Sequence, residues 1–289
     1  MKLLGTLALL SATCLSLTAC EQVQKVAADA VGLPTDKNIL FWTDAQRDKA
    51  FRMMDTLVPS NTIEAGENPK VLETGTALPD SFEVAGKPLS IDEYMEQQRL
   101  AGMVILQDGK IRKEEYRRDF DKDDRWTSFS VAKSLVSTLV GAAIKDGHIK
   151  SLDDPLTTYI PELKGSGYDG VTVLQLLTMT SGVKWNEDYA DPESDVALFN
   201  NTKPVDGMDP IIVYMKTLKN EATPGTRWQY NTGETNLIGV LVAKATGKTL
   251  SEYLSEKVWQ PYGMGQDAEW LLNASRRRCV TMRCSGSSP

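Results

Sequence analysis

Apolar residues repeat at helical spacing in one long stretch near the middle of the chain, over residues 129–144. They fall nearly all the way round a 3.6-residue period, which is typical of a helix buried on most faces. Lys133 is the only charged residue in this stretch. The pattern therefore predicts a central helix that begins at Ser130 and ends at a C-cap formed by Gly147.

Just before this stretch, two short runs read as strands, the mostly apolar residues 103–107 and residues 110–116. The two runs flank Asp108-Gly109, a dipeptide typical of a tight primed turn. This is the best strand signal in the chain, and it predicts a β-hairpin.

Shorter helices are predicted on both sides of these elements. Thr43 and Ser90 each open a capping box, the first beginning a helix that Pro59 ends and the second a helix that ends near residue 100. Between them, residues up to about 87 are expected to form a loop. Further helices are expected at 171–177, 209–218, 236–245 and 250–258, with a polar loop over 180–202. The middle of the chain is thus predicted to be mostly α, inserted after strands, which favours an α+β class.

Residues 1–20 have the pattern of an export signal. Lys2 precedes an apolar run over 3–17, which is too short to be a stable membrane span. The run ends in Leu-Thr-Ala-Cys, which resembles the lipobox of bacterial lipoproteins and implies cleavage before Cys20 and lipid attachment to its sulfur. We therefore expect a lipid anchor on the periplasmic side of a bacterial membrane, in the cell envelope, with a flexible tether over 21–40. A plain secretory signal cleaved nearby is the alternative.

Composition excludes several classes of function. A net charge of −7, a pI near 5.0 and no basic stripe argue against a nucleic-acid partner. Beyond the signal and Cys20, the only cysteines are Cys279 and Cys284, so no disulfide framework or metal knuckle holds the core. The acidic run 119–124 lacks the glycine and the glutamate of a calcium loop. His148 is the only histidine, so a Ser-His-Asp triad would depend on a residue expected in a solvated turn.

Candidate chemistry begins with Ser130 and Lys133, which share one helical face because they are three positions apart. A lysine placed in a buried helix loses hydration, which lowers its pKa and favours a neutral amine able to accept a proton. A hydroxyl at the helix start also lies at the positive end of the dipole. The pair is thus a candidate nucleophile and base. A second Ser-x-x-Lys, Ser181 to Lys184, contains a glycine and is expected to be a loop with an exposed lysine.

Tyr230 is the next candidate, because it lies in a loop before a predicted helix and two residues before the hydroxyl of Thr232. Its phenol would need a neighbouring lysine to lower its pKa before it could act as a base. The same spacing recurs at Tyr253 and Ser255 on an amphipathic helix, so a core tyrosine remains an alternative.

Several motifs occur in an order that identifies a family. After the hairpin come Ser130-x-x-Lys133, then Leu-Asp-Asp-Pro at 152–155, Gln-Leu-Leu-Thr-Met-Thr-Ser-Gly at 175–182 and Tyr-Asn-Thr-Gly at 230–233. Over residues 41–272 the chain resembles the beta-lactamase-related serine hydrolases, which include class C beta-lactamases, penicillin-binding peptidases, esterases and 6-aminohexanoate-oligomer hydrolases. The resemblance implies a beta-lactamase/transpeptidase-like α+β fold over 41–273, with an antiparallel sheet, helices and an all-α subdomain.

The resemblance also implies a mechanism. Ser130 would attack the carbonyl of a small-molecule ester or amide, Lys133 and Tyr230 would relay the proton, and water would release the acyl group. No metal or organic cofactor is implied. Thr232 stands where class C enzymes usually have asparagine, and Met179 where many relatives have histidine. These departures favour the aminohexanoate-hydrolase and esterase branch over beta-lactam hydrolysis.

The substrate pocket is expected to take its wall from the 180–202 loop. Trp185 and Tyr189 are its candidate residues there, together with Thr232 at the tyrosine motif. The alternative is that the two aromatic side chains only pack the loop.

The last residues depart from the family pattern. The sequence contains no Lys-Thr-Gly, Lys-Ser-Gly or His-x-Gly, the motifs that usually line the cleft from a C-terminal strand. Residues 274–289 hold four arginines and show neither a helical nor a strand period. We therefore expect a truncated member with an aberrant tail, in which the C-terminal strands of the sheet are missing and the hairpin keeps an open edge. A non-catalytic remnant or an envelope-binding lipoprotein is the alternative to an active hydrolase.

Overall fold

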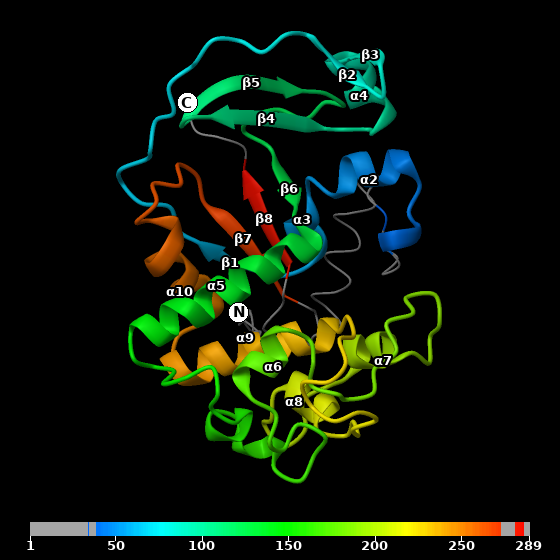
Figure 1. Ribbon diagram of the computed structural model, residues 1–289, viewed down its shortest axis with the longest axis vertical. Helices are drawn as coiled ribbons and strands as arrows, with labels where there is room; N and C mark the ends of the chain where they lie inside the picture. The colour runs from blue at the N-terminus through cyan, green and yellow to red at the C-terminus, as the bar shows by residue number, and fades with distance from the viewer. Residues whose placement is uncertain (1–33, 35–38, 273–280, 286–289) are drawn as a thin grey trace, which may run out of the picture.

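The computed structural model of the chain describes residue 34, residues 39–272 and residues 281–285. Figure 1 shows a β-hairpin at one end of the molecule, a small sheet in the middle and a group of short helices at the opposite end. The class is α+β, as the sequence predicts.

The central sheet joins strands from both ends of the described chain. Its strands are β1 (Ser60–Ile63), β7 (Ala268–Leu271), β8 (Thr281–Ser285) and β6 (Arg125–Thr127), in the order β1-β7-β8-β6, and every pairing is antiparallel. One face of the sheet contributes Ile63 and Trp270 to the core, where they are 0% and 1% exposed.

Strand β8 corrects one part of the expectation for residues 274–289, because residues 281–285 form a strand of the central sheet. It pairs with β7 on one side and with β6 on the other. A strand held on both edges by backbone hydrogen bonds does not need an alternating side-chain pattern, which is why the residue pattern contains no strand signal here. The segments 273–280 and 286–289 lie outside the described residues.

The predicted hairpin is confirmed as a separate two-stranded sheet of β4 (Gly102–Gln107) and β5 (Lys110–Tyr116). Asp108 and Gly109 form its turn with φ values of 53° and 75°. Positive φ at both central residues is the conformation of a type I′ turn, which glycine and aspartate tolerate better than most residues.

A second hairpin and a helix lie against the first. Strands β2 (Ser81–Val84) and β3 (Lys87–Ser90) lead into helix α4 (Ile91–Gln97), which Ser90 begins with the predicted capping box. The residues between Pro59 and Lys87 are expected to form a loop, but the structure places the strands β1 and β2 there.

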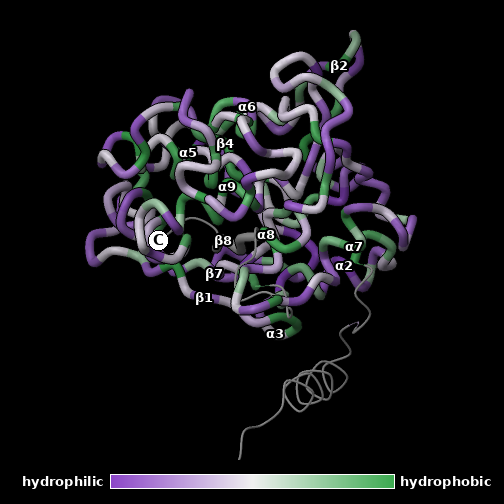
Figure 2. The backbone as a smooth tube through the Cα atoms, turned by 90° about the horizontal axis from the view of Figure 1, so that it is seen from below, coloured by the Kyte–Doolittle hydropathy of each residue, from purple (hydrophilic) through white to green (hydrophobic). Residues whose placement is uncertain are grey.

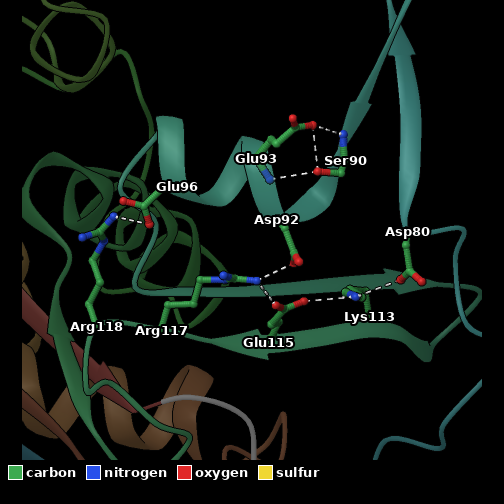
Figure 3. Close-up of polar contacts among 9 residues, drawn as sticks. All are labelled: Asp80, Ser90, Asp92, Glu93, Glu96, Lys113, Glu115, Arg117 and Arg118. Atoms are coloured by element: carbon green, nitrogen blue, oxygen red, sulfur yellow. Dashed lines mark hydrogen bonds and ion pairs between the residues drawn. The ribbon is translucent and has the colours of Figure 1, made fainter.

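Ion pairs connect this second unit to β5 (Figure 3). Arg117, just after β5, contacts both Asp92 of α4 at 2.5 Å and Glu115. Lys113 contacts Glu115 at 3.0 Å and Asp80 at 3.4 Å. The lysine contact lowers the pKa of the Glu115 carboxyl, so the pair is favoured at neutral pH.

Near the start of the described chain, Thr43 caps α2 (Asp44–Ala50) with the predicted capping box. The predicted helix does not continue to Pro59, because α2 ends at Ala50 and a separate turn, α3 (Met54–Leu57), follows.

The Ser130 segment forms a 3₁₀ turn, η2 (Phe129–Val131), followed by α5 (Ala132–Lys145). The helix therefore starts two residues later than predicted. It is also amphipathic rather than buried on most faces, since Ser134 and Ser137 are exposed. Its buried positions form one stripe, made of Ala132, Val136, Leu139, Val140 and Ala143.

The most buried helix is instead α9 (Thr232–Thr246), in which every residue from 233 to 243 is buried. Helix α5 packs on it, and Figure 2 shows hydrophobic colouring near both helices, with hydrophilic colouring along the outer loops. The other helices around α9 are α6 (Val173–Leu177), α7 (Asp195–Asn201), α8 (Pro210–Met215) and α10 (Leu250–Leu254).

Helices α6, α8, α9 and α10 lie largely where the sequence predicts helices, but one expectation for this region is wrong. Helix α7 lies inside the 180–202 segment that was expected to be a polar loop. The remaining turns are η1 (Ile39–Phe41), η3 (Leu156–Thr158), η4 (Pro161–Leu163) and η5 (Ser255–Trp259).

The predicted export signal at 1–20, including Cys20, lies outside the described residues, as does most of the predicted tether at 21–40. Within the part of the chain that the structure describes, no helix has the length and hydrophobicity to span a bilayer.

Candidate active site

Ser130 sits on a strained turn between the sheet and α5. Phe129, directly before it, has a φ of 45°, a left-handed conformation that is uncommon for a bulky residue. The Phe129 ring packs edge-on against Phe51, with 4.9 Å between ring centroids. This packing holds the unusual backbone in place, and strain of this kind is frequent at functional sites. The side chain of Ser130 is exposed.

Lys133 lies within reach of the serine. Its Nζ is 3.2 Å from Ser130 Oγ, the contact expected for residues three apart on one helical face. The lysine is half-buried rather than enclosed in a core. The predicted pairing is therefore present, whereas the predicted deep burial of the lysine is not, because α5 is amphipathic.

Tyr230 completes a group of three side chains. Its hydroxyl donates to Ser130 Oγ at 3.0 Å, and Lys133 Nζ lies 5.2 Å from the centroid of its ring. Burial raises the pKa of the phenol, but the contacts with Ser130 and Lys133 and the charge of the lysine outweigh burial. The pKa of Tyr230 therefore lies below its ordinary value. The core-tyrosine alternative does not hold, since the hydroxyl points to Ser130.

The tyrosine is held by the start of α9. Asn231 caps this helix by accepting a hydrogen bond from the Glu234 backbone N–H at 3.0 Å, so the helix begins at Thr232 rather than at residue 236. On the other side, the backbone N–H of Gln229 donates to the Met179 carbonyl at 3.0 Å. The tyrosine motif and the 175–182 motif are thus joined through backbone.

Thr232 and Tyr189 lie in a polar cluster beside this group. The Tyr189 hydroxyl is 3.3 Å from Thr232 Oγ1, and both hydroxyls donate to Glu187. Tyr189 is 44% exposed. The structure therefore brings these two predicted pocket residues together near Tyr230.

The position of Trp185 differs from the expectation that it lines the substrate pocket. It is 3% exposed and packs edge-on against Phe199 and Tyr214, with centroid separations of 5.8 and 6.4 Å. Its ring belongs to the core beneath the loop and cannot form the wall of an open pocket. Its indole N–H donates to Glu187, so it supports the polar cluster from below.

Two acidic residues near the site were not singled out from the sequence. Glu187 lies in a run of polar residues and has no pattern that distinguishes it from its neighbours. Glu234 is only 1% exposed, in the first turn of α9. A carboxyl group among the apolar residues of a buried helix is a signal that could have identified Glu234.

Glu234 Oε1 accepts hydrogen bonds from Ser181 and, at 3.4 Å, from the Tyr168 hydroxyl. Its other oxygen has no hydrogen-bond partner among the described residues. Burial raises the pKa of Glu234 to about 8, although both hydrogen bonds oppose this shift. At neutral pH the side chain is therefore mainly a neutral acid.

The lone histidine is far from this group. His148 is exposed and follows the C-terminal end of α5, whereas Ser130 precedes its N-terminal end. A helix of this length separates the two by roughly 20 Å. The Ser-His-Asp alternative is therefore excluded for Ser130. In the described part of the chain, no three His, Cys, Asp or Glu side chains are grouped so as to hold a metal ion.

The chain matches a known protein family over most of its length. The sequence pattern of the Beta-lactamase family matches residues 90–283, a range that contains the hairpin, Ser130, Lys133 and Tyr230. The chain belongs to the beta-lactamase family.

Relatives within this family carry different names. The 6-aminohexanoate-dimer hydrolase of Paenarthrobacter ureafaciens is 32% identical over 253 residues, which cover 83% of this chain and 60% of that protein. Esterase EstB of Burkholderia gladioli is 27% identical over 194 residues, which cover 60% of this chain and 48% of the esterase. The chain thus spans roughly half to three-fifths of the length of these relatives.

Solved structures support the beta-lactamase/transpeptidase-like fold. A Bacillus anthracis protein described as a candidate 6-aminohexanoate-dimer hydrolase superposes with a TM-score of 0.71 at 22% identity, covering 84% of this chain and 66% of that one. At this level of identity the match concerns the fold alone.

Proposed function

We propose that the protein is a serine hydrolase that cleaves an ester or amide bond through an acyl-enzyme on Ser130. The observation that carries this proposal is the double contact on Ser130 Oγ, with Lys133 Nζ at 3.2 Å and the Tyr230 hydroxyl at 3.0 Å. Both neighbours can exchange a proton with the serine hydroxyl, which is the arrangement that an activated nucleophile needs.

The reaction begins when the Tyr230 oxygen or the Lys133 amine accepts the hydroxyl proton as Ser130 Oγ attacks the substrate carbonyl carbon. The lowered pKa of Tyr230 increases the share of its phenolate at neutral pH, which favours the phenolate as the group that accepts this proton. The same group then donates the proton to the leaving alcohol or amine as the bond to the carbonyl carbon breaks. Water, deprotonated by the same pair, attacks the acyl carbon and releases the acid and free Ser130.

For the substrate we propose a small molecule with an amide or ester bond. The name of the Paenarthrobacter relative and Thr232 at the tyrosine motif support an amide such as an aminohexanoate oligomer, and the name of the Burkholderia relative supports an ester. Tyr189 and Thr232, whose hydroxyls lie 3.3 Å apart, are the proposed substrate-binding residues. We also propose that a lipid on Cys20 anchors the protein in the cell envelope.

The test is covalent labelling of the purified, folded protein with a small alkyl fluorophosphonate, followed by peptide mass mapping. We expect one adduct, on Ser130, and no adduct in Ser130→Ala. Turnover of a nitrophenyl ester and of an aminohexanoate dimer then separates the two substrate classes. A folded protein that forms no adduct would instead be a non-catalytic remnant, and this proposal would be wrong.

A further inference from the structure

Glu187, beside the site, accepts four hydrogen bonds. Its Oε1 accepts from the Tyr189 hydroxyl at 2.7 Å and from the Thr232 hydroxyl. Its Oε2 accepts from the Thr232 backbone N–H at 3.0 Å and from the Trp185 indole N–H. Both carboxylate oxygens are therefore occupied, and their donors come from two chain segments that are 45 residues apart.

The position of this carboxylate matters because Thr232 is the first residue of α9 and lies two residues after Tyr230. Backbone N–H groups in the first turn of a helix have no partner within the helix, and a negative charge there is favourable. By binding both the N–H and the hydroxyl of Thr232, Glu187 fixes the first turn of the helix that follows the tyrosine. It also links this turn to Trp185 in the core.

The charges around Tyr230 have opposite effects. The ammonium of Lys133 on α5 favours the phenolate and lowers the pKa of Tyr230, whereas the negative charge of Glu187 on the facing loop raises it. Glu187 thus opposes Lys133 at the same phenol.

We propose that Glu187 is a positioning residue for the Ser130 reaction, which fixes Thr232 and thereby holds the Tyr230 hydroxyl against Ser130 Oγ. This inference rests on the proposed function of Ser130. No motif of the chain contains Glu187, and its role follows from its four hydrogen bonds and from the location of Thr232.

The decisive variant is Glu187→Gln, which keeps the size of the side chain and removes its charge. An amide has one acceptor oxygen and one NH₂ donor group. The glutamine can therefore accept either the two hydrogen bonds made to Oε1 or the two made to Oε2. The donors of the other pair then face its NH₂ group. Glu193→Gln is the matched control, because it removes the same charge from an exposed position on the same segment.

The measurement is the rate constant for labelling of Ser130 by the fluorophosphonate, recorded from pH 5 to pH 10. For Glu187→Gln we expect a rate that is lower by roughly tenfold to a hundredfold, as is common for a misplaced catalytic group. Loss of the negative charge also lowers the pKa of Tyr230, so the rising limb of the pH profile should move to lower pH. Glu193→Gln should retain the rate and the profile of the unmodified protein.

Glu187→Asp separates positioning from a general loss of structure. It keeps the charge but shortens the reach by one methylene, so we expect a slower rate with a rising limb that moves less than in Glu187→Gln. Circular dichroism and thermal melting verify folding. If Glu187→Gln does not fold, Thr232→Val tests the same contact by removing only the hydroxyl donor, and it should also slow labelling.

The inference is overturned if Glu187→Gln labels like the unmodified protein, or if it labels slowly with an unshifted rising limb, since a merely structural defect gives that result. It is also overturned if Glu193→Gln loses as much labelling rate as Glu187→Gln. If Glu187→Gln does not fold and Thr232→Val is measured in its place, labelling of Thr232→Val at the full rate overturns the inference. Failure of the unmodified protein to label at Ser130 is a separate outcome, which rejects the proposed function and this inference with it.

Discussion

Ser130 Oγ contacts Lys133 and Tyr230, and the chemistry of these two neighbours differs. Lys133 carries a charge on a flexible stem, whereas Tyr230 presents a single hydroxyl from a rigid ring. Because the lysine lowers the pKa of the phenol, a larger share of Tyr230 is phenolate at neutral pH, and we expect the two residues to act as one unit. The two residues should therefore not contribute independently to the rate.

A Lys133→Ala variant tests this dependence. Removing the ammonium lets the pKa of Tyr230 rise, so the rate of Ser130 labelling should fall by about a hundredfold or more and the rising limb should move to higher pH. Tyr230→Phe should cause a comparable loss, and the double variant should be little worse than either single one. Losses that multiply in the double variant would contradict the coupled unit. The measurement is again the pH profile of fluorophosphonate labelling.

Glu234 gives a prediction about stability rather than rate. Its pKa is raised to about 8 in the folded protein, above the usual value of a carboxyl group in the unfolded chain. The folded state therefore holds this proton more tightly, and its contribution is present at low pH and lost as the pH rises toward 8. The loss is on the order of a few kcal/mol.

The test is Glu234→Gln, which keeps the hydrogen bonds from Ser181 and Tyr168 but cannot ionise. The unfolding free energy of both proteins is measured in urea at several pH values. The difference, variant minus unmodified protein, should increase from pH 5 to pH 9. Parallel curves for the two proteins would show that Glu234 does not hold its proton in the folded state.

At the scale of elements, β8 is the feature that sequence reasoning missed most clearly. It lies between β6 and β7 and contacts the η2 turn that carries Ser130. Without it, both neighbouring strands would have an unpaired edge, and short strands without partners are marginally stable.

A chain that ends after Leu272 should therefore melt several degrees lower and label more slowly at Ser130, because η2 loses the strand beside it. Differential scanning calorimetry and the labelling rate measure the two effects. A shortened chain with unchanged melting and labelling would show that β8 does not support the turn.

How much of the structure the sequence predicts depends on how local the cause is. The capping boxes at Thr43 and Ser90 and the turn at Asp108-Gly109 depend on neighbouring residues, and the structure has them where predicted. The spacing of Ser130 and Lys133 likewise produced the contact expected on one helical turn. Burial is not local, because it depends on which elements pack together. For this reason the residue pattern predicts α5 as the central helix, although α9 occupies that place.

The site follows the same rule. Tyr230 could be proposed from a motif, but Glu187 and the buried position of Trp185 depend on how the 180–202 segment folds against α9. No periodicity reports a contact between segments that are 45 residues apart. The residues proposed to hold the reacting groups in place are thus harder to predict from the sequence than the proposed reacting groups themselves.

At the scale of the whole molecule, ion pairs are among the contacts that join the hairpin end to its neighbouring helix. Arg117 contacts Asp92 and Glu115, and Asp92 is 74% exposed (Figure 3). Exposed ion pairs contribute little to stability, because water and salt screen them.

We therefore expect Arg117→Gln to change the melting temperature much less than removal of β8 does, and to leave labelling at Ser130 unaltered. A large fall in melting temperature at low salt that disappears at high salt would show that this network matters more than its exposure indicates. Thermal melting at two salt concentrations is the measurement.

The Ser130 and Tyr230 hydroxyls meet although 100 residues separate them in the chain, because α5 packs against α9. The rate at which the fluorophosphonate labels Ser130 consequently reports whether α5 and α9 are packed together. In a denaturant series, the reagent should stop modifying the serine as soon as the helices part, even while far-ultraviolet ellipticity persists. A chemical probe of a single hydroxyl group would then resolve a loosening of the core that spectroscopy of the backbone averages away.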